Sequence, residues 1–138
     1  MISLEKVSAK QKEIFDNCMK VVAVKGADYN RKQQKKGDTL FNMRVTALAG
    51  LVRSPQAGIL IRLQDKLQRL ASLENPAETP ATKDEAVKDT IQDAIVYLTY
   101  FQLFYEEERD EIQALGKTLN AEADEEKERT QGASDLGY

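Results

Sequence analysis

Histidine and tryptophan are absent from this 138-residue chain, and cysteine occurs once. The lack of histidine removes the commonest general base and the usual nitrogen ligand of zinc. The single cysteine, Cys18, excludes an internal disulfide, and its apolar neighbours at helical spacing predict a packing role in a reducing compartment. Any chemistry must therefore use carboxylates, amines, hydroxyls or metal-bound water.

Long apolar runs and a strong net charge are also lacking. No stretch approaches the roughly 20 apolar residues of a membrane span, and the N-terminus lacks the basic and apolar regions of a secretion signal. The formal net charge of -3 comes from 20 basic and 23 acidic residues, so no overall field favours binding to DNA or an anionic membrane. We therefore expect a cytoplasmic protein, with neither membrane nor nucleic acid as a partner.

Apolar residues recur every three to four positions in several segments, and no segment alternates as a strand does, which predicts an all-α protein. The expected helices cover about 9–25, 39–52, 55–73 and 82–105. The last helix either continues or is followed by a short fifth helix that ends near Gly116. At this length one core is the default, so we expect a single domain over 1–119 and an acidic, disordered tail over 120–138.

Capping signals mark three of the helix starts. Ser8 with Gln11 fits a capping box at the first helix, and Thr82 with Glu85 forms the clearest one at the fourth. Ser54 followed by Pro55 supplies an N-cap and a first-turn proline for the third.

A polar stretch over 26–38, between the first two expected helices, predicts a basic loop. It carries four basic side chains: Arg31, Lys32, Lys35 and Lys36. These cations can meet phosphates, and the nearby rings of Tyr29 and Phe41 can stack on a base.

An acidic line runs along the fourth helix, because Glu85, Asp89 and Asp93 fall at successive fourth positions. A solvated acidic face is one interpretation, and it suits Glu85, which serves the capping box. Beyond Asp93 the helix is apolar almost all round over 94–105, which predicts burial by neighbours, including a second subunit. The face with Asp93 therefore runs into a core, where an arginine or a metal ion must offset its charge.

The third helix carries one acid, Asp65, roughly opposite a stripe of leucines: Leu60, Leu63, Leu67 and Leu70. A short connection favours antiparallel packing of the third and fourth helices, which would bring Asp65 near Asp89 and Asp93. Magnesium prefers such oxygen ligands, and Arg62, Lys66 and Arg69 would then face phosphate charge. A surface salt-bridge cluster is the alternative interpretation of Asp65.

Three segments together resemble a known family: KGADYN at 25–30, IRLQDKLQRLASL at 61–73 and DEAVKDTIQDAIVYL at 84–98. Their order and spacing are similar to the phage and bacterial nucleotide-modification-associated domain family. That family is itself similar to the all-α nucleoside triphosphate pyrophosphatases of the MazG-like and dimeric dUTPase-like type.

The resemblance implies a four- to five-helix bundle of the MazG-like type that forms homodimers or homotetramers through its central helices. It implies a nucleotide substrate, cleavage between the α and β phosphates, and magnesium or manganese that activates the attacking water. The implied catalytic and metal-facing acids are Asp65, Asp89 and Asp93, with Glu85 on the same line. The implied pocket lining is Lys25, Asp28 and Tyr29, with Lys66 and Arg69 nearby. The implied location is the cytoplasm of a bacterium or a phage-infected host.

The chain also departs from the MazG-like pattern. The EExxE motif is reduced to Asp65, with Gln64 before it and Arg69 four residues after it, and Thr90 stands where the ExxD motif has its glutamate. With fewer ligands, a second hypothesis is a non-catalytic protein that sequesters a nucleotide, including a cyclic signalling nucleotide. A third is a structural helical module whose acids are salt-bridge partners.

Overall fold

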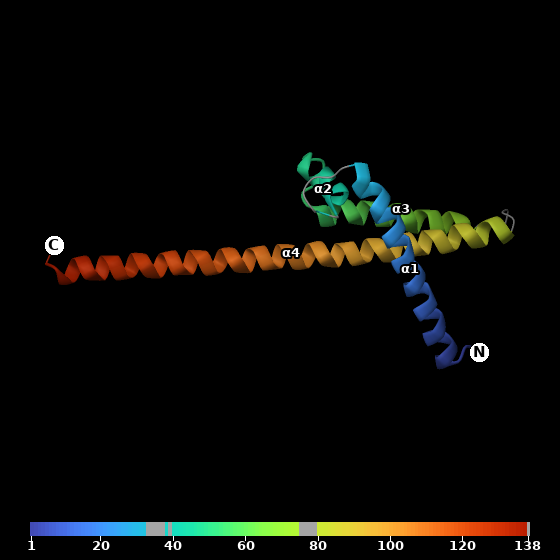
Figure 1. Cartoon of the computed structure of the whole chain (residues 1–138), viewed down its shortest axis with the longest axis horizontal. Coiled ribbons are helices and arrows are strands. Elements are labelled where there is room, and N and C mark those ends of the chain that lie inside the picture. The colour runs from blue at the N-terminus through green and yellow to red at the C-terminus, as the bar shows by residue number, and fades with distance from the viewer. Residues whose placement is uncertain (33–37, 39, 75–79, 138) are drawn as a thin grey trace. The chain divides into compact units, whose positions relative to one another are not determined.

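The computed structural model describes the backbone of residues 1–32, 38, 40–74 and 80–137, and their side chains except those of 25–32 and 80–82. Within these residues the chain is all-helical, as the sequence predicts (Figure 1). The four helices are α1 (Leu4–Lys32), α2 (Phe41–Leu48), α3 (Pro55–Leu73) and α4 (Pro80–Asp135). None of the described helices is long and apolar enough to cross a membrane.

The chain divides into two compact units, Met1–Gln102 and Leu103–Tyr138. The first unit holds α1, α2, α3 and the beginning of α4, and the second consists mainly of the rest of α4. This division falls earlier than residue 119, where the sequence analysis places the end of the domain.

The structure also differs from the predicted disordered tail, because α4 continues as a helix to Asp135. Alanine, glutamate, lysine, arginine and glutamine dominate this part of the chain, and all of them have high helix propensity. Lys127 and Asp124 add an ion pair at 3.6 Å across one helical turn. The few apolar residues indicate an exposed segment and do not themselves exclude a helix.

α1 begins at Leu4 and not near Ala9, since the hydroxyl of Ser3 accepts a hydrogen bond from the amide of Lys6 at 3.3 Å. Ser3, and not the predicted Ser8, therefore caps this helix. The helix also continues to Lys32, through part of the stretch predicted as a basic loop. The rest of that stretch, over 33–37, lies outside the described residues, as do the side chains of 25–32.

α2 has eight residues and ends sooner than predicted, at Leu48. Gly50 has φ 72°, and its amide donates to the carbonyl of Ala47 at 2.9 Å. The amide of Leu51 donates to the carbonyl of Thr46 at 3.0 Å. These two bonds form a Schellman motif, which needs a left-handed residue that glycine provides without steric cost. Gly50 therefore ends α2.

α3 confirms its predicted bounds, and the hydroxyl of Ser54 accepts a hydrogen bond from the amide of Ala57 at 3.2 Å. α3 packs against α2. Gly58 lies at this contact, where an added Cβ would sit 3.3 Å from Thr46 Oγ1 and 3.6 Å from Val52 Cγ2. An alanine at this position would require the Thr46 side chain to shift by a few tenths of an ångström.

Among the side chains that the structure describes in the first unit, the core is small, and its buried apolar members are Cys18, Met43, Ile59 and Leu73. On α3, two of the four leucines predicted to form the buried stripe are exposed, because Leu60 is 54% and Leu67 is 62% accessible. The buried face of α3 is centred instead on Ile59, with Leu70 close to its centre and Leu63 at its edge. The predicted stripe is centred about 60° around the helix from Ile59.

Candidate functional site at the contact of α3 and α4

Two side-chain contacts establish how α3 and α4 pair. Lys66 Nζ lies 3.0 Å from Asp93 Oδ2, and the guanidinium of Arg62 lies over the ring of Tyr97, 6.0 Å from its centroid. Arg62 lies four residues before Lys66 on α3, whereas Tyr97 lies four residues after Asp93 on α4. The two helices are therefore antiparallel, as predicted. They lie side by side in Figure 1.

Asp93 lies on the half-buried side of α4, which confirms that the acidic line runs towards packed side chains. Its side chain is 28% exposed, and that of Lys66 is 22% exposed. The cation beside Asp93 is thus a lysine, which the sequence analysis places against phosphate. A half-buried ion pair of this kind is less screened by water than a surface pair, so each charge stabilises the position of the other.

Aromatic side chains continue the same face of α4 beyond Asp93. Tyr97 and Tyr100 are both half-buried, and burial raises the pKa of the Tyr100 phenol, with the nearby Tyr97 adding to the effect. Arg62 on the ring of Tyr97 gives a cation–π contact close to the ion pair. The sequence analysis counted both tyrosines within the apolar stretch over 94–105 and did not predict the contact with Arg62.

Thr90, which the sequence analysis compares with the glutamate of an ExxD motif, is 1% exposed. Its hydroxyl donates to the carbonyl of Ala86 in the preceding turn at 2.6 Å. The donor of this side chain is therefore satisfied within α4. A carboxylate at this position would be buried, so the threonine belongs to the packing and does not replace a metal ligand.

The remaining predicted acids do not gather around Asp93. Asp65, Glu85 and Asp89 are exposed, and the described part of the chain contains no group of three acidic or cysteine side chains that could hold a metal ion. Asp89 lies one turn before Asp93 on α4, so these two carboxylates share one side of the helix. The geometry offers at most a site with two carboxylates from α4.

The other predicted binding residues are distributed around this contact or fall outside the description. Arg69 is exposed on α3, Arg62 is half-buried, and Phe41 is half-buried at the first position of α2. The side chains of Lys25, Asp28 and Tyr29 lie in the part of α1 whose side chains are not described.

An ion pair before α2 was not predicted. Arg44 Nε donates to Asp38 Oδ2 at 2.6 Å, and Asp38 Oδ1 accepts from the amide of Leu40 at 3.0 Å. Asp38 therefore holds the chain just before α2 begins. Its signal was an aspartate three residues before the first residue of a helix, which is typical of a side chain that bonds to an amide two residues on.

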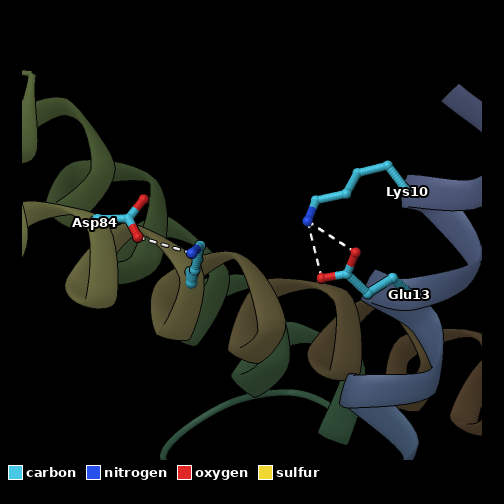
Figure 2. A network of polar contacts seen from close by, with 4 residues as sticks. Lys10, Glu13 and Asp84 are labelled. Carbon is cyan, nitrogen blue, oxygen red and sulfur yellow. Dashed lines mark hydrogen bonds and ion pairs between the residues drawn. The ribbon is translucent and has the colours of Figure 1, made fainter. Parts of the chain in front are cut away.

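α1 meets the beginning of α4 on another side. The thiol of Cys18 lies 4.0 Å from the carbonyl of Gln92, and burial raises the pKa of this thiol. Figure 2 shows the Lys10–Glu13 pair of α1 together with Asp84 of α4. Asp84 forms an ion pair with Lys88 at 2.7 Å. The pKa of Lys88 is raised mainly by Asp84, with a smaller contribution from Glu13. This side of α4 is polar and exposed, unlike the side that carries Asp93.

Comparisons with known proteins find no matching family model, no matching curated protein and no matching solved structure.

Proposed function

We propose that this chain binds nucleotides where α3 meets α4, and that it acts as a magnesium-dependent pyrophosphohydrolase on canonical or modified nucleotides. The observation that supports this most directly is the half-buried Lys66–Asp93 pair next to the Arg62–Tyr97 contact. Within two helical turns this contact offers cations for phosphate, a carboxylate for a divalent ion and an aromatic ring. The resemblance of the three sequence segments to nucleotide-modifying and pyrophosphatase families points to the same ligand class.

The phosphate-binding role falls to Lys66 and Arg62. In the free protein the ammonium of Lys66 pairs with Asp93. An entering phosphate would offer this ammonium a second anion, to which it can donate a charge-assisted hydrogen bond. Arg62 presents a planar fork of donors that can bind phosphate in a bidentate manner while its face stays on Tyr97. Arg69, exposed one turn further along α3, extends the positive edge of the site.

Asp93 and Asp89 are the carboxylates that would hold magnesium. Magnesium in nucleotide sites is usually bound by one or two carboxylates together with substrate phosphates and water, so two acids on one side of α4 fit this ion. When bound, the ion shields phosphate charge and activates a water for attack on phosphorus. Asp65 and Glu85, which are exposed, would act at most on the outer edge of the site.

Exposed apolar side chains of the first unit support association with further copies. They include Leu60, Leu67 and Leu98 on the central helices. Apolar side chains that remain in water favour an interface that buries them. We propose a homodimer or homotetramer that covers these leucines.

The observed ion pair also favours a second candidate function, nucleotide sequestration without cleavage. Lys66 already neutralises Asp93, and no third acid lies close to it among the residues that the structure describes. Such a site retains the groups that attract phosphate but has few side chains that could coordinate a catalytic metal ion. It could bind cyclic signalling nucleotides as well as linear ones.

A panel of nucleoside triphosphates with magnesium separates the two functions. We expect pyrophosphate release that is lost in Asp93→Asn and kept in Asp84→Asn, which removes an equally charged, 65% exposed side chain from the opposite side of α4. Tight binding in calorimetry without turnover would establish sequestration instead. If no nucleotide, linear or cyclic, raises the melting temperature with or without magnesium, both functions are refuted and the helical interaction module remains.

A further inference from the structure

The second unit carries an apolar seam on an otherwise charged helix. Tyr105, Ile112 and Leu119 follow one another at intervals of seven residues, and Leu115 lies between the last two. Their exposed fractions are 54%, 64%, 55% and 59% in the same order. An interval of seven with an intermediate apolar position is the spacing by which one α-helix packs along another. We call these four residues the C-terminal seam.

Acidic residues also occupy positions of this heptad register. Glu108 lies between Tyr105 and Ile112, and Glu122 and Glu126 follow Leu119. The segment 103–138 contains eleven acidic and four basic residues, a formal net charge of -7. The rest of the chain carries +4, since the whole chain carries -3. The charge of this protein is thus strongly divided between its two units.

We propose that the C-terminal seam is a docking surface for a basic amphipathic helix of another protein. Isoleucine and leucine at the seam positions would meet apolar residues of that helix, and lysines or arginines of the partner would lie opposite Glu122 and Glu126. Complementary charge of this kind sets the register and partner choice of paired helices. The proposal does not depend on the nucleotide site.

A second copy of the same segment fits this surface less well. In a parallel pair each Glu108 would face its counterpart at the seam, as would Glu122 and Glu126. Like charges brought together in this way destabilise a pair of helices, and a net charge of -7 on each copy adds a general repulsion. A basic partner turns the same residues into attractive contacts.

The probe is a synthetic helical peptide of about four heptads. It has isoleucine and leucine at the positions that would meet Ile112, Leu115 and Leu119, and lysine at the positions that would meet Glu122 and Glu126. The matched peptide has glutamate in place of each lysine. We expect the full-length chain to bind the lysine peptide at least about tenfold more tightly than the glutamate peptide, and binding to weaken as salt is raised. Equal affinity for the two peptides would overturn the proposal.

Substitutions on the chain locate the binding surface. Replacing Ile112, Leu115 and Leu119 by glutamine, which keeps helix propensity, should weaken binding by at least about tenfold. The control is Ala114→Gln with Ala121→Gln, which introduces the same side chain off the C-terminal seam and should bind as the wild type does. Unchanged binding by the triple variant would refute the docking surface.

A charge variant provides a second test in case circular dichroism shows that the triple variant has lost helical content. Glu122→Gln with Glu126→Gln should reduce both the affinity and its salt dependence. Asp124→Asn with Glu128→Gln removes the same charge on the outer side of the helix and should have a smaller effect. Equal effects of the two pairs, or self-association of the chain that the triple variant abolishes in sedimentation, would show that a basic helix is not the occupant.

Discussion

The half-buried Lys66–Asp93 pair should contribute measurably to the stability of the first unit, and a double-mutant cycle tests this. The perturbations are Lys66→Met, Asp93→Asn and both together. At an effective dielectric constant of about 20, two charges about 4 Å apart attract each other by about 4 kcal/mol, and loss of hydration offsets most of this. Since the two side chains keep 22% and 28% of their exposure, we expect a net coupling of about 1 kcal/mol.

The assay is urea unfolding of all four proteins at low and at high salt, monitored by circular dichroism. In a thermal scan, a coupling of this size corresponds to a shift of roughly 4 °C in the melting temperature of a unit of about 100 residues. The control cycle uses Lys88 and Asp84, whose side chains are 64% and 65% exposed at a similar distance of 2.7 Å. A coupling for Lys66 and Asp93 no larger than that of the control pair would refute the argument from burial.

Three further predictions concern packing, backbone conformation and pH. Thr90→Glu, which introduces the acid that the resemblance would place there, should destabilise the protein by about 3 kcal/mol or more in urea unfolding, because the side chain of Thr90 is 1% exposed. Gly50→Ala should cost about 1 kcal/mol of unfolding free energy, since φ is 72° and no atom lies within 4 Å of the added Cβ. The matched Gly116→Ala, in a helix with open space around it, should instead stabilise α4 by up to about 1 kcal/mol, measured as thermal unfolding. For Cys18, burial raises the thiol pKa, so the folded state retains this proton longer than the unfolded state. Stability measured by urea unfolding should therefore fall as pH rises above the ordinary thiol pKa of about 8.5, and Cys18→Ala should lose that part of the pH dependence.

Each of these has a contrary result. Thr90→Glu with wild-type stability would mean that the position opens to water. A Gly50→Ala variant as stable as Gly116→Ala would argue against strain at the end of α2. A pH profile of Cys18→Ala identical to that of the wild type would assign the alkaline loss to other groups.

Local signals in the sequence predicted the helices better than the faces along which they pack. Ser54 with Pro55 identified the start of α3 because an N-cap and a first-turn proline act within one turn. Gly50 carried an equally local signal for the end of α2, which the apolar periodicity up to Val52 concealed. The continuation of α4 to Asp135 was missed because high helix propensity was given less weight than the lack of apolar residues.

The candidate site was predictable in position and only partly in its pairing. Helical geometry placed Asp93 on a side of α4 that runs into packed residues, and the structure has it half-buried. The same geometry does not identify the cation that contacts Asp93, because Arg62, Lys66 and Arg69 all lie on the same side of α3. Leu60 and Leu67 show a related difficulty, since a leucine stripe does not reveal whether α4 or another molecule covers it.

The contact at Gly58 has a consequence for how the first unit unfolds. A helix of eight residues such as α2 lies below the length at which helices persist alone in water, about 12 residues. Its helical state therefore depends on lying against α3, at the place where the missing side chain lets Thr46 come close. Amide protons of α2 should exchange with solvent no more slowly than those of α3, because once the two helices separate, nothing within α2 holds it in shape.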